Sequence, residues 1–169
     1  GSITNTVKHL ESHSLVTHEP YRGVKLTREG ERIALDIIRK HRLAECLLTD
    51  VLKAEWSSVH EEACKLEHSL SKKIVALIDE KLGHPKFCPH GNPIPTKSGS
   101  VKEQACVALN DADLSKNYIV SRIIGEDQES LTMFAKKKIK PNAEVNVVKR
   151  EVDKVFLRVE GKKCFLSKD

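Results

Sequence analysis

Apolar residues in the first part of the chain recur at the spacing of an α-helix. Ile3, Val7 and Leu10 lie three or four positions apart with polar residues between them, which predicts a short amphipathic helix that ends near Ser12. Thr27, a residue type that caps helix N-termini, precedes further apolar residues at helical spacing. This spacing predicts further helices over about residues 28–53, 58–70 and 70–83. This half of the chain is therefore expected to be mainly helical.

A β-prone stretch follows the first predicted helix. Residues 15–17 and 24–26 are mostly aliphatic or β-branched, and residues 19–23 between them have the composition of a turn. A helix followed at once by a hairpin is the layout of a winged helix, in which a helix enters the DNA groove and the hairpin contacts the backbone. Residues 1–27 are therefore interpreted as part of a DNA-binding unit.

The apolar pattern changes to short alternating runs in the last third of the chain. The elements that this pattern predicts are strands over residues 118–120, 145–148, 155–159 and 164–166, and one short helix over 131–138. Residues 160–163 between the last two strands have the composition of a hairpin turn. A small SH3-like β-barrel over residues 104–169 accounts for this pattern most simply.

Proline and small polar residues separate the two halves. Three prolines in seven residues exclude a helix over 88–95, and residues 96–100 are small and polar, as in a linker. We therefore expect an α+β multidomain chain. Its parts are a partial winged helix-turn-helix domain over 1–27, an all-α domain over 28–95, a linker over 96–103 and a β-barrel over 104–169.

Composition narrows the possible partners. The net charge of +5 and the isoelectric point near 8.9 are compatible with DNA, whereas 4% aromatic residues argue against a base-stacking platform. No apolar run is long enough to cross a membrane, and five irregularly spaced cysteines do not form a disulfide framework. We expect a cytoplasmic protein with reduced thiols and no membrane partner. The chain does not begin with Met, and we expect it to be N-terminally incomplete.

Metal-binding side chains gather on one predicted helix. His60, Cys64, Glu67 and His68 lie at offsets of 0, 4, 7 and 8, which places them on one helical face. An exposed helix can carry such residues for solubility alone, with Cys64 as a small buried side chain. Their position on one face favours a metal site over that alternative.

A matching pair lies on the preceding helix. His41 and Glu45 are four residues apart and so share a face. Facing helices that each present such pairs build metal sites in helical proteins. Imidazole, carboxylate and thiolate together suit Fe2+, Co2+, Ni2+ or Zn2+, whereas Mg2+ and Ca2+ prefer oxygen ligands.

The other cysteines are expected to serve packing. Cys46, Cys106 and Cys164 are isolated and are predicted to lie in the core. Cys88 and His90 could bind a metal, but no second pair at zinc-site spacing accompanies them. We therefore expect both of them to pack in the loop.

Two other functions use the same ligands. The segment 60–64 is similar to the HExxH helix of metalloproteases, but a cysteine stands in the place of the second histidine. A thiolate there reduces the Lewis acidity of the ion, which disfavours a hydrolase. A metal-dependent hydrolase and a metal-buffering module are kept as alternatives.

Three segments resemble the iron-dependent repressors of the diphtheria toxin repressor class. They are residues 39–45, residues 59–64 with Glu67 and His68, and the Gly91–Pro95 segment GNPIP. The resemblance is specific over residues 3–95. It is weaker over 104–169, which is similar to the SH3-like, FeoA-type third domain of that family.

The resemblance implies a fold, a ligand set and a function. It implies a metal-dependent transcriptional regulator, not an enzyme, in which Fe2+ promotes binding of a homodimer to operator double-stranded DNA and represses iron-uptake genes. Co2+, Ni2+, Mn2+ or Zn2+ can substitute. The implied primary ligands are Cys64, Glu67 and His68, and the implied ancillary ligands are His41, Glu45 and His60. Cys64 favours the iron branch, since the manganese-responsive branch has a carboxylate there.

The resemblance leaves two parts of the sites open. Glu126, Asp127 and Glu129 are candidates for ligands from the third domain, without an assignment. The family's first helix supplies a further ligand to the primary site and is not present in this sequence.

DNA contacts are expected on the first predicted helix and the turn. Thr4 and Asn5 are candidates for base contacts, and Lys8 and Arg22 for phosphate contacts. The operator sequence does not follow from these residues.

Overall fold

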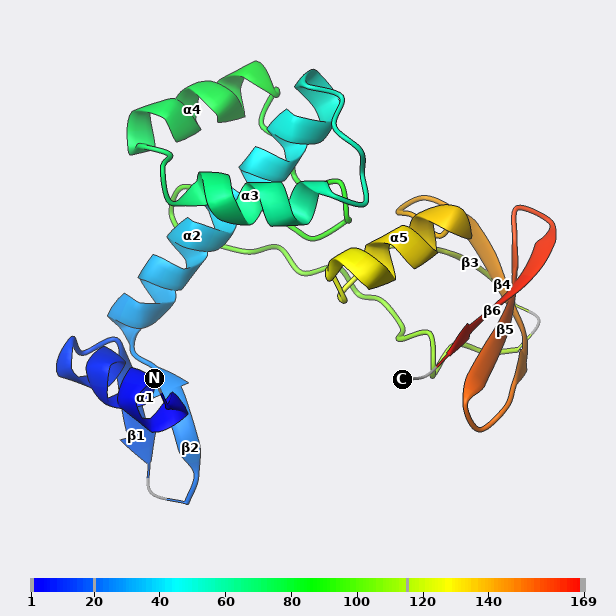
Figure 1. The fold of residues 1–169 in the computed structure, drawn as a ribbon, viewed down its shortest axis with the longest axis horizontal. Helices are drawn as coiled ribbons and strands as arrows, with labels where there is room; N and C mark the ends of the chain where they lie inside the picture. Colours follow the sequence, from blue (N-terminus) through cyan, green and yellow to red (C-terminus); the bar gives the residue numbers. More distant parts are fainter. Residues whose placement is uncertain (1, 20, 115, 168–169) are drawn as a thin grey trace.

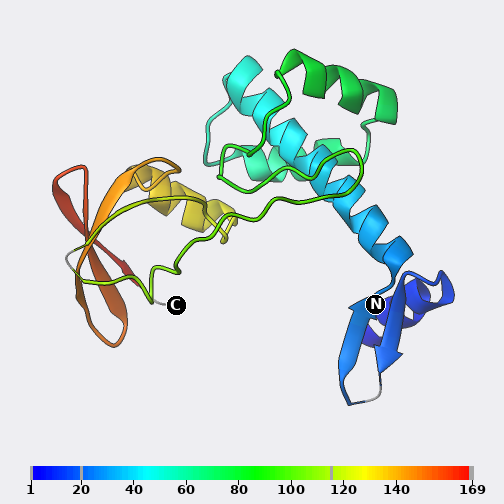
Figure 2. The ribbon, with the colours of Figure 1, turned by 180° about the vertical axis from the view of Figure 1, so that it is seen from behind.

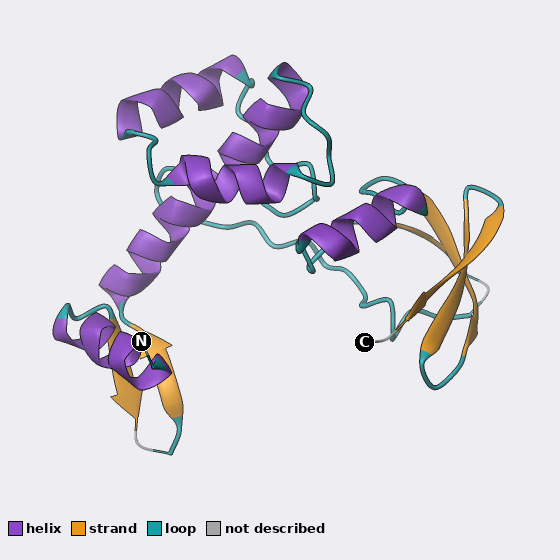
Figure 3. Cartoon of the chain, in the orientation of Figure 1, coloured by secondary structure: helices purple, strands orange, loops and turns teal. Residues whose placement is uncertain are grey.

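The computed structural model describes residues 2–19, 21–114 and 116–167. The helices lie mainly in the middle of the molecule and the strands at its two ends (Figure 3). The presence of both helices and strands confirms the prediction of an α+β chain. None of the helices within the described ranges combines the length and the apolar character needed to cross a bilayer.

The N-terminal end consists of a helix and a two-stranded antiparallel sheet. Helix α1 (Ile3–Ser12) is followed by strands β1 (Val16–Glu19) and β2 (Gly23–Leu26), which pair with each other. Helix α2 (Arg28–Cys46) then leads away from this group, and a π-helical segment, η1 (Leu47–Val51), continues it (Figure 1). The predicted helix over 28–53 therefore begins at the expected place but changes its winding at Leu47.

The start of α2 is fixed to the N-terminal group. The Thr27 side chain accepts a hydrogen bond from the Gly30 amide (3.0 Å), as an N-cap does, and donates one to the Ser14 carbonyl (2.7 Å). The Thr27 amide also donates to the Leu15 carbonyl (3.0 Å). Gly30 lies so close to Leu15 that an added Cβ would be 2.0 Å from its carbonyl oxygen. The direction of α2 is thus tied to the position of α1 and the hairpin.

Two further helices pack against α2. They are α3 (Val59–Glu67) and α4 (Lys72–Lys81), and they lie beside it in Figure 1. Arg39 of α2 is buried, where it forms an ion pair with Asp79 of α4 (2.8 Å) and donates to the Pro95 carbonyl (2.6 Å). The core of this group consists of Leu43, Cys46, Val75, Ile78, Cys88 and Ile94.

The C-terminal end is an antiparallel sheet with one helix. Strands β3 (Asn117–Ile119), β4 (Glu144–Arg150), β5 (Lys154–Val159) and β6 (Lys162–Ser167) pair in that order, and helix α5 (Gln128–Lys136) precedes β4. Alternate residues of β4 and β5 are buried, as expected for a sheet with one covered face. Within the described ranges β3 and β6 are edge strands. The SH3-like barrel therefore stays a prediction.

The cysteines differ in part from expectation. Cys46 is buried as predicted, and Cys164 is half-buried. Cys106, which was predicted to lie in the core, is exposed. Cys106 lies in residues 101–108, which form no helix or strand, so no periodic pattern of such an element turns this side chain inward.

Gly30→Ala should lower the free energy of unfolding by about 1–3 kcal/mol, because the new methyl group would collide with the Leu15 carbonyl. In a helix without a neighbour at that position, Gly→Ala raises the free energy of unfolding by about 1 kcal/mol. A lowered free energy of unfolding in Gly30→Ala therefore identifies the collision. Urea denaturation measures it. Gly125→Ala is the control, since Gly125 has no positive φ and an added Cβ would make only an ordinary 3.9 Å contact with Asp127 Oδ2. A loss at Gly30 no larger than at Gly125 would contradict the close approach.

Candidate metal centre

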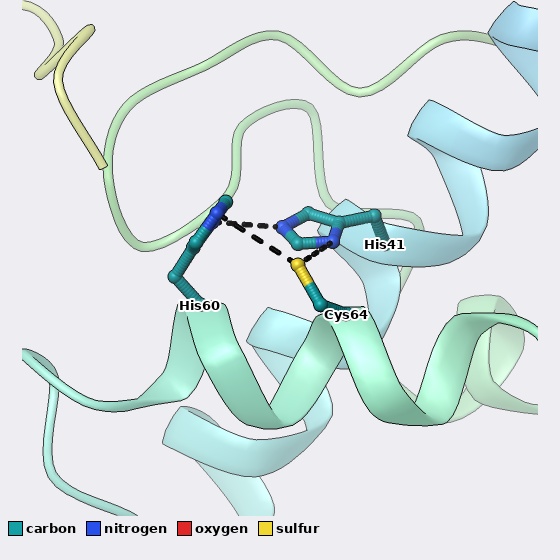
Figure 4. Close-up of side chains that lie close together, drawn as sticks. All are labelled: His41, His60 and Cys64. Carbon is teal, nitrogen blue, oxygen red and sulfur yellow. Dashed lines mark hydrogen bonds between the residues drawn. The ribbon is translucent and has the colours of Figure 1, made fainter. Parts of the chain in front are cut away.

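Three potential ligands converge between α2 and α3. Figure 4 shows His41 on α2 pointing toward His60 and Cys64 on α3. The His41 Nε2 atom is 3.1 Å from His60 Nδ1, and the Cys64 sulfur is 3.8 Å from His60 Nε2 and 4.0 Å from His41 Nδ1. One ligand atom from each residue lies within 4.8 Å of the other two. We call these residues the α2–α3 group.

A second group lies beside the first and draws on three separate segments. Glu45 comes from α2, Cys88 and His90 come from the loop after α4, and Glu126 precedes α5. Their ligand atoms also lie within 4.8 Å of one another. His90 Nδ1 is 3.0 Å from Glu45 Oε1 and 3.4 Å from Glu126 Oε1. We call these residues the loop group.

The ring of His90 is oriented by a backbone contact. Its Nε2 atom lies 3.1 Å from the Trp56 carbonyl oxygen, which can only accept a hydrogen bond. Nε2 therefore carries the proton, and Nδ1 faces the two carboxylates of the loop group. In metal sites an oriented histidine of this kind presents the lone pair of its other nitrogen to the ion.

Glu45 joins the two groups. Its Oε1 atom is 3.0 Å from His90 Nδ1, 3.1 Å from His41 Nε2 and 3.4 Å from His60 Nδ1. The side chain is fully buried, and Oε2 has no hydrogen-bond partner among the described residues. A buried carboxylate oxygen without a partner is costly, and a bound cation would satisfy it. The donor set and this oxygen therefore fit a transition-metal ion.

In the absence of an ion, the Glu45 carboxylate and the nearby imidazoles of His41 and His90 stabilise each other's charged forms. Burial by itself would raise the pKa of Glu45, but the hydrogen bonds with His41 and His90 outweigh it and hold the pKa well below its usual range. Burial likewise opposes protonation of His41 and His90, yet their hydrogen bonds, including those with Glu45, raise both pKa values. A carboxylate between the protonated imidazoles of His41 and His90 is the expected metal-free state.

Both thiols of the site are held in their protonated form. Burial and the nearby carboxylates, Glu67 first among them, raise the pKa of Cys64. Burial is also the largest cause that raises the pKa of Cys88. A cation is needed to stabilise either thiolate, since only the deprotonated sulfur is a good ligand.

The structure brings four of the six predicted ligands, His41, Glu45, His60 and Cys64, into the two groups. Cys64 was grouped with Glu67 and His68, whereas the structure places it against His41 and His60. Glu67 Oε2 lies 2.8 Å from His41 Nδ1, so it contacts the α2–α3 group through that ring. His68 is 72% exposed, with its Nε2 3.3 Å from Glu67 Oε1. The division into primary and ancillary ligands stays a prediction.

Sequence reasoning assigned Cys88 and His90 to packing. Both are indeed buried, but they also point into the loop group. Glu45 of α2, the carboxylate that His90 contacts, lies 45 residues earlier in the sequence, so no local spacing could predict the contact. Among the third-domain candidates, Glu126 joins the group, whereas Asp127 caps α5 by accepting a hydrogen bond from the Ser130 amide (2.9 Å).

The C-terminal part is fastened to the loop group by Asn92. The Asn92 amide donates to Glu126 Oε1 (2.7 Å) and to the Ile123 carbonyl (3.0 Å). The Ile123 amide in turn donates to the His90 carbonyl (2.8 Å). Gly91 between them approaches so closely that an added Cβ would lie 2.1 Å from the Ser121 carbonyl oxygen. The loop and the segment before α5 are thus held in contact at the site.

Comparisons with known proteins identify relatives of this chain. Residues 27–96 match the family model for the iron dependent repressor, metal binding and dimerisation domain. The diphtheria toxin repressor of Corynebacterium efficiens is 31% identical over 160 residues, a match that covers 89% of this chain and 70% of that protein. The chain belongs to the diphtheria toxin repressor family. The recognition made from the three sequence segments is therefore confirmed.

Other members of the diphtheria toxin repressor family show how far the likeness extends. The diphtheria toxin repressor of Corynebacterium jeikeium is 40% identical over 94 residues, which cover 56% of this chain but only 39% of that protein. The solved structure of a manganese-dependent transcriptional repressor in complex with manganese has a TM-score of 0.89 and 32% identity. It matches 97% of this chain, and the match covers 78% of the solved chain. The likeness thus includes the C-terminal sheet.

The residues predicted to contact DNA lie on the surface of the N-terminal group. Thr4, Asn5 and Lys8 are exposed on α1, and Arg22 is exposed in the turn between β1 and β2. They are therefore accessible to a partner, and their contact with DNA stays a prediction.

Cys64→Ser and Cys88→Ser should each remove one of two cobalt-thiolate absorption bands from the Co2+-loaded protein, because each group contains one thiol. Ultraviolet-visible titration measures the bands. Cys106→Ser is the matched control, since Cys106 is exposed outside both groups. Loss of both bands in either single variant would mean that the two groups form one site.

Metal affinity should rise with pH. The metal-free protein holds protons on His41, His90 and both thiols because their pKa values are raised, and an ion must displace them. Affinity therefore rises with pH through the neutral range and levels off only above the raised pKa values of these groups. Competition with a chromogenic chelator at several pH values measures this dependence. A pH-independent affinity would contradict the described charge states.

Proposed function

We propose that this protein is a transcriptional repressor whose DNA binding is switched on by a divalent transition-metal ion, with Fe2+ as the metal in the cell. The observation that carries the proposal is the convergence of the α2–α3 group and the loop group on Glu45. This carboxylate lies on the same helix whose other end is fixed to α1 and the hairpin.

The mechanism is a linkage between metal and the orientation of α1. An ion bound by residues of α2, α3, the 88–95 loop and Glu126 stabilises the arrangement that brings these segments together. Because Thr27 and Gly30 fix α1 to the start of α2, this arrangement also sets the position of α1. Metal and DNA then favour each other by the same factor. A change from 1% to 99% active molecules requires about 5.5 kcal/mol of differential binding.

The choice of Fe2+ rests on the ligands and the family. The two thiols, three imidazoles and two carboxylates of the two groups suit borderline transition ions better than Mg2+ or Ca2+. The family model carries iron in its name, and the similar solved structure carries manganese. Co2+, Ni2+, Mn2+ and Zn2+ are expected to substitute, because coordination chemistry alone does not exclude them.

We propose operator double-stranded DNA and a second copy of the chain as partners. In this proposal residues 1–27 form part of a winged-helix domain, 28–95 form the metal-binding and dimerisation domain, 96–103 are a linker and 104–169 form an SH3-like, FeoA-type domain. Thr4 and Asn5 would face bases, and Lys8 and Arg22 would contact phosphates. A two-fold dimer presents two such units to two half-sites. A chromosomal operator implies that the protein acts in the cytoplasm.

The similar proteins favour a regulator over the hydrolase alternative. The relatives that cover most of this chain are named as repressors, and no enzyme is among those described above. A metal-buffering module would use the same ligands without responding to DNA. DNA binding as a function of metal therefore separates the two remaining interpretations.

Co2+ should increase the affinity of the protein for promoter DNA of the host's iron-uptake genes by at least about tenfold, and a chelator should reverse it, because metal fixes α1 through α2. Fluorescence anisotropy under anaerobic conditions measures both. A Glu45→Gln variant should lose most of the metal effect. Equal affinity with Co2+ and with chelator would contradict the proposal.

Lys8→Ala and Arg22→Ala provide a second test of the DNA contacts. Each should weaken binding and reduce its salt dependence, since each removes a phosphate contact. Lys162→Ala is the control, because Lys162 is exposed in β6, far from α1 in Figures 1 and 2. An equal loss in the control would mean that only net charge matters.

A further inference from the structure

A groove lies on α2 apart from the metal ligands. It has a volume of about 420 Å³, and its walls are α2, α4 and the 96–99 turn. In Figure 2 the segment that follows α4 passes along α2. The residues lining the groove are Arg32, Leu35, Asp36, Arg39, Lys40, Lys72, Val75, Ala76, Thr96, Lys97, Ser98 and Gly99. None of them belongs to the α2–α3 group or the loop group.

Positive charge dominates this groove. Three of its cations are paired: Arg32 with Glu29, Arg39 with Asp79 and Lys40 with Asp36. Lys72 and Lys97 form no ion pair within the described part of the chain. The groove therefore carries two ammonium groups that a bound anion could neutralise.

The turn on one side of the groove is ordered and offers hydroxyl donors. The Thr96 amide donates to the Ser100 carbonyl (2.9 Å), and the Ser100 amide donates to the Thr96 hydroxyl (3.0 Å). The hydroxyls of Thr96 and Ser98 are 2.9 Å apart and line the groove. Gly99 closes the turn with a φ of +83°, a conformation that side chains disfavour. Lys97 is thereby held on a fixed turn.

Part of the groove lining is apolar. Leu35, Val75 and Ala76 are among the lining residues. A volume of this size lies within the range of small-molecule sites, which combine apolar walls with a few polar anchors. Ammonium and hydroxyl groups together suit phosphate, which accepts several hydrogen bonds and carries two charges.

We propose that this groove binds a phosphate-bearing anion, either a small phosphorylated molecule or a phosphate of the DNA backbone. Arg32, at one end of the groove, follows Gly30 by two residues, so the groove begins near the contact between α2 and the N-terminal group. DNA held by α1 and the hairpin is therefore a second possible source of the same chemical group. The proposal goes beyond metal-controlled repression and does not require it.

Inorganic pyrophosphate tests the proposal on the metal-free protein. Nuclear magnetic resonance titration should show saturable shifts of the Lys72 and Thr96–Gly99 amides. The double variant K72Q/K97Q should weaken pyrophosphate binding by about tenfold, since each lysine contributes a charged hydrogen bond. The control K81Q/K86Q removes the same charge from exposed positions outside the groove. Equal weakening in both double variants, or shifts spread over the surface, would overturn the proposal.

Salt dependence distinguishes the two sources of phosphate. If the groove serves DNA, K72Q/K97Q should reduce the slope of log affinity against log salt by about 1.8 relative to K81Q/K86Q in the Co2+-loaded protein. If it serves a small molecule, the two slopes should agree while pyrophosphate binding still differs. Ser98→Ala, which leaves the lysines in place, should also weaken pyrophosphate. If the groove variants change neither pyrophosphate binding nor the salt dependence of DNA binding, both sources of phosphate are excluded.

Discussion

The structure depends on one buried carboxylate. Glu45 is fully buried, yet three imidazoles lie around its Oε1 atom, and its Oε2 atom has no partner among the described residues. A negative charge in such a place is tolerable only when positive charge surrounds it. Protonated His41 and His90 supply that charge in the metal-free chain, and a bound cation would supply it in their place. Binding of a cation would therefore have to displace these protons.

Helix α2 connects this carboxylate to the N-terminal helix and hairpin. One of its ends holds His41 and Glu45, and the other is capped by Thr27 against the end of the first helix and the hairpin. A continuous helix is a stiff connection, so in the proposed function ordering at the metal end would limit the positions available to α1. The groove with Lys72 and Lys97 borders the stretch between these two ends. Metal and anion would thus act on one shared element.

The C-terminal part takes part in the site. Glu126 contributes a carboxylate, and Asn92 ties that carboxylate and the Ile123 carbonyl to the loop that carries His90. The close approach of Gly91 to Ser121 leaves no room for a side chain there. The C-terminal part therefore contributes to the site, because the loop group is incomplete without the segment that precedes α5.

The local features of this protein follow from its amino-acid sequence alone. Helical spacing predicted α1 to α4, the polar-apolar alternation predicted the strands, and the offsets of His41, Glu45, His60 and Cys64 placed ligands on facing helices. Only the tertiary structure brought Cys88, His90 and Glu126 to Glu45, and only it left His68 and Cys106 exposed. The physical reason is that periodicity encodes which side of an element faces inward. It does not encode which distant loop packs against that side.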